Sequence, residues 1–182
     1  MDISAVILIA FGLSVDAFAV SVSNGLCIKD LKIGLALRIA LFFGLFQAFM
    51  PVLGWMAGIR IRPFIGIYSN IISFLILLVL GIKMIADALR AEEKKCFNCS
   101  DIYVLALFAV ATSIDAFAVG FGFSLLSMSI VKPVIIIGII TFFVSLLGIR
   151  IGQKIGHFFE NRIEVLGGLI LILIGFKILL GY

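Results

Sequence analysis

The sequence predicts an all-α membrane protein with six transmembrane helices arranged as two inverted three-helix repeats. Composition and an internal repeat predict this class. Hydrophobic residues make up 64% of the 182 residues and charged residues 13%, whereas soluble domains have roughly 45–50% apolar and about 25% charged residues. The chain is therefore expected to lie in a lipid bilayer, and the lipid bilayer is one of its predicted partners.

Six apolar runs each approach the roughly 20 residues that a helix needs to cross about 30 Å of hydrocarbon. They cover residues 3–22, 35–58, 65–89, 102–126, 131–152 and 163–180. Because lipid offers backbone groups no hydrogen-bond partners, we expect each run to be a helix. The first run lacks the basic start of a signal peptide and contains Asp16, so we expect it to remain in the mature fold.

One motif occurs twice. Residues 14–20 read SVDAFAV and residues 113–119 read SIDAFAV, with an offset of 99 (115 − 16) between the two aspartates. A second offset of 94 (148 − 54) relates later positions: Gly54 and Gly148, Gly58 and Gly152, Lys83 and Lys177. Two related halves of three spans each follow from these matches.

The repeat divides a single integral membrane domain, residues 1–182, into three parts. Repeat one covers residues 1–90, a linker covers 91–101, and repeat two covers 102–182. Since each repeat has an odd number of spans, the second must enter the membrane from the opposite side. Inverted repeats are typical of secondary transporters, whose site lies at the repeat interface near the membrane midplane.

Basic residues predict the orientation. The connections after the first, third and fifth spans, with their flanks, are the more basic: Lys29, Lys32, Arg38, Arg90, Lys94, Lys95, Arg150, Lys154 and Arg162. The opposite connections hold Arg60, Arg62 and Lys132. The first set is expected to be cytoplasmic, which places both termini outside. Because the net charge of +4 is spread along one membrane face, no nucleic-acid partner is expected.

Asp16 and Asp115 are the predicted metal ligands. An aspartate at the centre of a membrane span costs about 3 kcal/mol on insertion scales, so it is seldom kept without a function. If the first and fourth helices cross at the pseudo-symmetry axis, both carboxylates face one polar cavity. Oxygen ligands suit Mg, Ca or Mn, whereas zinc or copper would call for histidine or thiolate. Protons could compete with the metal for the same two acids.

Four other polar residues are candidates for the same cavity: Gln47, Thr112, Thr141 and Ser145. Thr112 lies three residues before Asp115, on the same helix face. Gln47 precedes Pro51, which we expect to interrupt the second span, and both a site role and a packing role are open for it. For Thr141 and Ser145 we favour packing, with the hydroxyls bonded back to their own helix.

Lys83 and Lys177 are the candidate charge-balancing residues. In one interpretation each lysine pairs with an aspartate of the site and holds the cavity neutral when metal is absent. In the favoured one each lies within about two turns of its helix end, where a long side chain can snorkel to lipid headgroups.

The three cysteines are Cys27, Cys96 and Cys99. A cytoplasmic position argues against a structural disulfide. The C-x-x-C pair could contribute to a soft-metal site with Cys27 and the distant His157, but ordinary loop cysteines are the favoured interpretation.

Three motifs carry a resemblance to a known family: residues 10–19 (AFGLSVDAFA), 51–55 (PVLGW) and 111–120 (ATSIDAFAVG). Together they resemble the MntP manganese efflux pumps, small bacterial six-helix membrane proteins distantly related to LysE-type exporters. The resemblance covers almost the whole chain. It implies export of manganese from the cytoplasm across the bacterial inner membrane, with the manganese ion as transported substrate and no resident cofactor.

The resemblance also implies that Asp16 and Asp115 are the functional acids. Similar proteins can carry a carboxylate near the position of Gln47, and an amide cannot take up a proton. Metal coordination by the amide oxygen of Gln47 would still be open to this chain.

Three alternatives stay open from the sequence. They are export of a small organic cation, as in the LysE-like relatives, a passive divalent-cation channel, and an intramembrane aspartyl enzyme, whose two acids would share a proton. A transporter is expected rather than an enzyme. The sequence does not determine the selectivity among divalent ions or the coupling ion. It also does not determine the oligomeric state, and a homo-oligomer is open.

Overall fold

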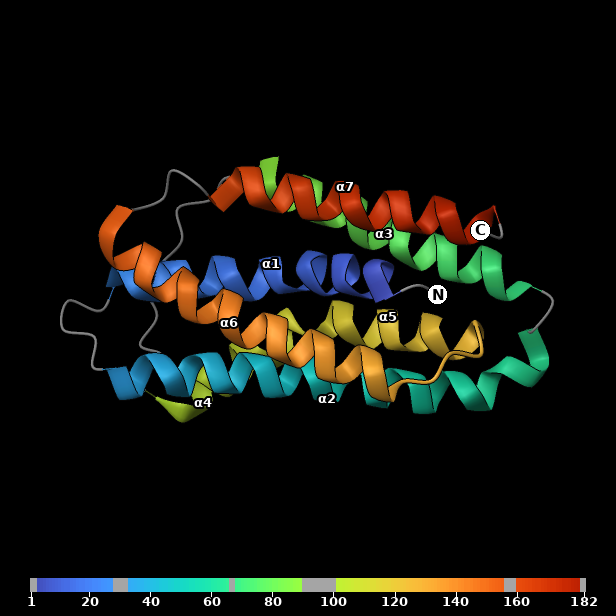
Figure 1. Cartoon of the computed structure of the whole chain (residues 1–182), viewed down its shortest axis with the longest axis horizontal. Helices are drawn as coiled ribbons and strands as arrows, with labels where there is room; N and C mark the ends of the chain where they lie inside the picture. The colour runs from blue at the N-terminus through green and yellow to red at the C-terminus, as the bar shows by residue number, and fades with distance from the viewer. Residues whose placement is uncertain (1–2, 28–32, 66–67, 90–100, 156–159, 181–182) are drawn as a thin grey trace.

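The computed structural model describes residues 3–27, 33–65, 68–89, 101–155 and 160–180. Within these ranges the chain forms helices and no strands: α1 (Ile3–Cys27), α2 (Ile33–Ile65), α3 (Ser69–Leu89), α4 (Ile102–Thr112), α5 (Ile114–Leu125), α6 (Val131–Ile155) and α7 (Glu160–Leu179). The helices are aligned along one long axis, and the two chain ends lie at the same end of the bundle (Figure 1). The all-α prediction is confirmed.

Some of the expected membrane spans are evident from helix length and composition. In the described part of the chain, α1, α2 and α6 are each long and apolar enough to cross a bilayer, and α4 with α5 would make a fourth span as a bent pair. In α3 the apolar stretch is shorter, Asn70–Lys83. The protein is thus a multi-pass helical membrane protein.

The prediction of one continuous helix over residues 102–126 is wrong. The segment is bent by 41° between α4 and α5, and Ser113 at the break has φ −109° and ψ 8°. The Ser113 hydroxyl donates a hydrogen bond to the Ala109 carbonyl at 2.6 Å, and the Thr112 hydroxyl donates to the Phe108 carbonyl at 2.9 Å. Hydroxyls that bond back to the preceding turn compete with the backbone ladder and bend helices.

The expected interruption at Pro51 is also wrong. The helix α2 runs through Pro51 without a break, which membrane helices tolerate when neighbouring groups satisfy the freed backbone. The backbone of Pro51 packs directly against Gly120 of α5, where a methyl group would have no room. The contact with α5 therefore supports α2 at the position where the sequence predicted an interruption of the helix.

Two helix interfaces repeat the same pattern of contacts. Helix α1 packs mainly against α6, and α3 packs along α7. Among the helices of the second half, α2 packs mainly against α5. In the α1–α6 interface Gly148 meets Phe18, and in the α2–α5 interface Gly54 meets Phe117. These residues are related by the offsets of 94 and 99, so equivalent positions make equivalent contacts.

Repeat-related glycines also meet each other. A methyl group built on Gly44 of α2 would lie 3.0 Å from the carbonyl oxygen of Gly138 in α6, and one built on Gly138 would lie 3.2 Å from the carbonyl oxygen of Gly44. The offset between the two glycines is again 94 (138 − 44). The crossing of α2 and α6 therefore relates the two halves of the bundle.

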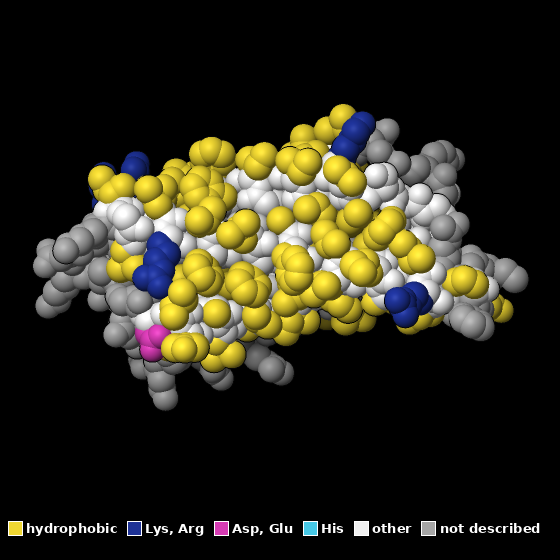
Figure 2. All heavy atoms as spheres, turned by 90° about the horizontal axis from the view of Figure 1, so that it is seen from below, with side chains coloured by type: hydrophobic (Ala, Val, Ile, Leu, Met, Phe, Trp, Pro, Cys, Tyr) yellow, Lys and Arg dark blue, Asp and Glu magenta, His cyan; other side chains and the backbone are white. Residues whose placement is uncertain are grey.

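The surface of the bundle is suited to lipid. Many large apolar side chains point outward, such as Leu107 (69% exposed), Leu173 (67%) and Val79 (62%). In Figure 2 hydrophobic side chains cover the middle of the visible face, while Lys and Arg lie toward its two ends. A soluble monomer rarely exposes a continuous apolar surface of this kind, but hydrocarbon covers it at no cost.

Trp55 ties α2 to the connection between α5 and α6, because its indole N–H donates a hydrogen bond to the Met128 carbonyl at 2.9 Å. We expect Trp55→Phe, which keeps an aromatic ring but loses the donor, to lower the free energy of unfolding by about 1 kcal/mol. Circular dichroism melting in detergent measures the effect. Tyr68→Phe, which removes a polar group from an exposed ring, is the control. Equal melting of Trp55→Phe and the parent would contradict the prediction.

Candidate functional site

Asp115 lies at the break between α4 and α5, in the first turn of α5. The side chain is 4% exposed. Its Oδ1 accepts a hydrogen bond of 2.7 Å from the Ala116 N–H, while its Oδ2 has no hydrogen-bond partner in the described part of the chain. The positive end of a helix macrodipole favours a carboxylate at this place. The helix thus anchors one carboxylate oxygen and leaves the second available to a ligand.

The break also changes the backbone around Asp115. The backbone bonds that cross it run from the Ser113 N–H to the Val110 carbonyl and from the Phe117 N–H to the Ser113 carbonyl, both at 3.1 Å. The carbonyls of Ala111 and Thr112 lie at this break, at the C-terminal end of α4. In discontinuous membrane helices, such carbonyls and the helix ends serve as ligands for transported ions.

Thr112 itself uses its hydroxyl within α4. The hydroxyl donates to the Phe108 carbonyl at 2.9 Å and lies 3.3 Å from the Ala109 carbonyl. Its hydrogen is therefore committed, and only the oxygen lone pairs could face a cation. The role of Thr112 that the structure does display is in bending the chain.

Asp16 occupies the equivalent place in the first half, but on an unbroken helix. It is half-buried in α1. Among the described residues, the charged side chains of Asp16 and Lys83 act electrostatically on Asp115. Two acids that are 99 positions apart in the sequence are therefore close enough in the fold to influence each other, with a lysine of α3 in the same neighbourhood.

Gln47 connects α2 to the turn of α1 that precedes Asp16. The side chain is 1% exposed, and its Nε2 donates a hydrogen bond to the Leu13 carbonyl at 2.9 Å. Leu13 is three residues before Asp16, so the amide lies about one helical turn from that aspartate. Gln47 is brought to the centre of the bundle.

The hydroxyls of Thr141 and Ser145 in α6 do not make the hydrogen bonds that the packing interpretation predicted. Both are 0% exposed, yet neither hydroxyl has a hydrogen-bond partner among the residues that the structure describes. The expected bond back to their own helix is not formed. Ser14 of α1, by comparison, donates to the Phe11 carbonyl at 2.8 Å.

The two lysines are exposed on the protein surface. Lys177 lies in the last turn of α7, a position that fits snorkelling, whereas Lys83 also acts on Asp115.

Cys96, Cys99 and His157 lie outside the described residues, as does the side chain of Cys27. In the described ranges there is no group of three or more His, Cys, Asp or Glu side chains that could hold a metal ion.

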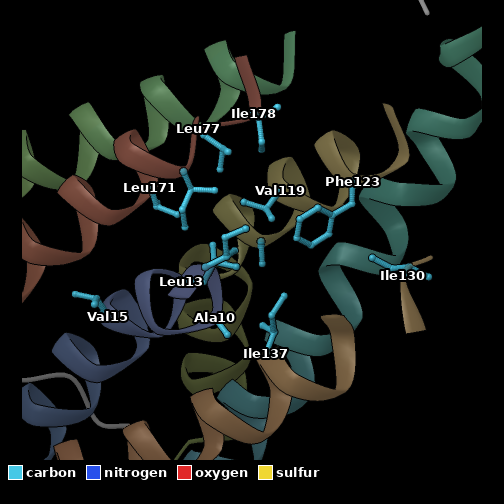
Figure 3. Packing of buried hydrophobic residues seen from close by; sticks show 13 residues of the cluster. Ala10, Leu13, Val15, Leu77, Val119, Phe123, Ile130, Ile137, Leu171 and Ile178 are labelled. Carbon is cyan, nitrogen blue, oxygen red and sulfur yellow. The ribbon is translucent and has the colours of Figure 1, made fainter. Parts of the chain in front are cut away.

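Apolar side chains pack around the site. One core cluster joins α1, α3, α5, α6 and α7, and Figure 3 shows Leu13 of α1, Val119 of α5 and Leu171 of α7 pointing toward a shared interior. Ala116, next to Asp115, belongs to the same cluster. Electrostatic interactions are stronger in such surroundings than in water.

Sequence reasoning missed three serines. Ser21 and Ser124 have buried hydroxyls without a partner in the described part of the chain, and Ser113 bends the chain at the break. For Ser113 a signal existed: the second motif is preceded by Thr112, while the first is preceded by Leu13. Two consecutive hydroxyl residues favour a helix break that one alone does not produce.

The fold defines a multi-pass α-helical membrane protein, and in it the buried Asp115 of α5 lies close enough to Asp16 of α1 for the two acids to interact. The family model described as "Mntp: Putative manganese efflux pump" matches residues 30–179. The chain belongs to this MntP family, which is a family of efflux pumps and not of enzymes.

Individual relatives match over nearly the whole chain. A Methanothermobacter thermautotrophicus protein named "Putative manganese efflux pump MntP" is 51% identical over 181 residues, which cover 99% of this chain and 97% of that protein. A Crocosphaera subtropica protein of the same name is 47% identical, covering 99% and 96%. "Putative manganese efflux pump MntP 2" of Clostridium botulinum is 45% identical, covering 98% and 94%. No solved structure matches the chain.

Proposed function

We propose that this protein exports Mn²⁺ from the cytoplasm as a secondary transporter, and that Asp16 and Asp115 bind the ion. The names of its relatives support the substrate and the direction of transport. Carboxylate, amide and carbonyl oxygens are ligands that suit manganese. The transported ion is the substrate of the site, not a resident cofactor.

The observation that carries the proposal is the state of the Asp115 carboxylate. It is buried at a helix break with one oxygen anchored and the other without a hydrogen-bond partner in the described structure, and Asp16 acts on it from α1. Two neighbouring acids inside a membrane repel each other and are poorly solvated, so a dication that binds both relieves both costs. The Gln47 amide and the carbonyls at the break would complete an oxygen-rich site.

The arrangement of the halves supports two inverted three-helix repeats. Equivalent glycines make equivalent contacts in the α1–α6 and α2–α5 interfaces, and Gly44 meets its own equivalent, Gly138. In Figure 1, α1 begins at the end where the chain termini lie, whereas α4 begins at the opposite end. Rocking of one repeat against the other would expose a central site alternately to the two sides.

Lys83 supplies a charge that the ion can replace. It acts on Asp115 from α3, and its long side chain can move between the carboxylate and the headgroup region. When manganese binds, the lysine is no longer needed to balance the two acids. Proton exchange or the membrane potential would then drive the cycle without a third carboxylate at position 47.

The proposed orientation follows the basic residues. Arg150 and Lys154 are exposed near the end of α6, at the end of the bundle where α1 also finishes (Figure 1). We assign this end to the cytoplasm, which places both termini outside the bacterial inner membrane.

Manganese accumulation in cells that lack their own exporter tests the proposal. The parent chain should lower cell manganese, and Asp16→Asn at a matched membrane level should not, because the pair then carries one negative charge instead of two. If the parent leaves manganese unchanged but lowers another divalent or an organic cation, the manganese assignment is wrong. If Asp16→Asn exports as well as the parent, the two-aspartate site is wrong.

A further inference from the structure

Three buried hydroxyls have no role in the aspartate site described above. They belong to Ser21 of α1 and to Thr141 and Ser145 of α6, and each is 0% exposed. In the described part of the chain none of them has a hydrogen-bond partner. An unpaired buried hydroxyl costs stability, so its presence at three neighbouring positions points to a ligand.

Thr141 and Ser145 lie on one stripe of α6, which meets α2 at Gly138 and reaches α1 at Gly148, where Ser21 lies. A methyl group built on Gly148 of α6 would lie 3.1 Å from Cβ of Ser21. Ser145 is three residues before Gly148, hence on the same face of α6, and Thr141 lies one further turn toward the middle. On α1, Asp16 is five residues before Ser21, about 7.5 Å along the helix axis. The three hydroxyls therefore extend from the level of the aspartates toward the C-terminal ends of both helices.

The other half of the bundle shows that helix packing does not require these hydroxyls. The repeat equivalents of Ser21 and Ser145 are Gly120 and Pro51, at offsets of 99 and 94. Gly120 and Pro51 pack backbone to backbone in the α2–α5 interface. The equivalent of Thr141 is Gln47, whose side-chain amide is bonded to the Leu13 carbonyl. In the described part of that interface, Ser124 against Gly58 is a buried hydroxyl without a partner, and no row of such hydroxyls follows it. The two interfaces are equivalent in packing and different in polarity.

We propose that Ser21, Thr141 and Ser145 form the entry path for a partly hydrated divalent cation, between the cytoplasmic end of the α1–α6 interface and the aspartates. This inference rests on the proposed export of manganese. Hydroxyl oxygens are hard, uncharged ligands, and a path must bind the ion strongly enough to admit it and weakly enough to release it. The carboxylates then take the ion from the hydroxyls.

The path is closed in this structure. Gly152 packs against the backbone of Val22, and Gly25 packs against the backbone of Ile149, so the cytoplasmic part of the interface leaves no room for an ion. Separation of α1 from α6 opens the path and allows water and the ion to reach the hydroxyls. Movement at the glycine contacts is therefore part of the entry step.

The combined variant Ser21→Ala, Thr141→Val, Ser145→Ala tests the inference. Inside-out membrane vesicles expose the cytoplasmic face, and initial rates of manganese uptake are measured over a range of concentrations. The KM should rise by about tenfold or more, as for the loss of supporting groups at metal sites, while the rate at saturating manganese is retained because both aspartates remain. The melting temperature should be unchanged or higher, because the variant removes unpaired polar groups while nearly keeping their shape.

Ser124→Ala is the matched control, since it removes a buried unpartnered hydroxyl from the α2–α5 interface; its KM should equal that of the parent. A parent-like KM in the combined variant would overturn the entry path while leaving manganese export intact. A raised KM accompanied by a lower melting temperature would also overturn it, because it would indicate a structural role. Absence of manganese uptake by the parent itself would instead count against the proposed function.

Discussion

Replacing Asp115 by asparagine is expected to stop manganese transport while the protein remains folded. The variant keeps the shape of the side chain and can still accept the Ala116 N–H bond at the start of α5. It loses the negative charge that holds the ion in the proposed site. Two unit charges 4 Å apart interact by about 4 kcal/mol at an effective dielectric constant of about 20, so the affinity for a dication should fall by more than about 100-fold.

Manganese uptake into inside-out vesicles and equilibrium binding to purified protein both measure this effect. The matched control is Asp101→Asn, because Asp101 is an exposed aspartate that caps α4 through the Tyr103 N–H at 3.0 Å, and asparagine caps helices equally well. Asp115→Glu, which keeps the charge on a longer side chain, should retain partial binding. Full activity of Asp115→Asn would exclude this carboxylate from the ion site.

Gly54→Ala is expected to have the largest effect on stability. A Cβ at this position would collide with the backbone of Phe117 and Phe121 in α5, and the backbone cannot rotate away as a flexible side chain can. Overpacking of this kind costs about 1–3 kcal/mol, and it would push apart one of the two main helix interfaces. Both the melting temperature and the amount of protein in the membrane should fall.

Gly34→Ala provides the comparison within the same helix. Nothing lies within 4 Å of a Cβ built on Gly34, and alanine is the better helix former, so this variant should melt at the parental temperature or slightly above it. Thermal melting in detergent measures both. If Gly54→Ala and Gly34→Ala behave alike, close approach of α2 and α5 is not required for the fold.

Composition and the repeated motif were sufficient to predict the helical class, because a largely apolar chain in lipid can satisfy its backbone only within helices. The positions of the helix breaks were predicted less well. Pro51 suggested an interruption that α2 does not have, since contact with Gly120 supports the helix. The real break lies at Ser113, where two adjacent hydroxyls bond back to the preceding turn.

For the candidate site, the motifs predict the two acids but do not predict that the surroundings of the two acids differ. Asp16 and Asp115 have almost the same neighbours in the sequence, yet one lies within a continuous helix and the other at the start of a new one. Contacts across helices also decide which polar groups are paired. The Gln47 amide donates a hydrogen bond to the Leu13 carbonyl, 34 positions away, while Thr141 and Ser145 have no partner in the described chain. Helical spacing alone could not predict which of these side chains is paired.

The contact between Gly44 and Gly138 bears on how the two halves of the protein arose. In the proposed inverted repeat, the two glycines are the same position in the two halves, and they touch each other. A residue that meets its own counterpart is what a two-fold symmetric dimer has on its axis. In an origin by duplication and fusion, this is the contact that a three-helix subunit would make with a second, oppositely inserted copy of itself, and Gln47 and Thr141 are equivalent positions that differ between the halves.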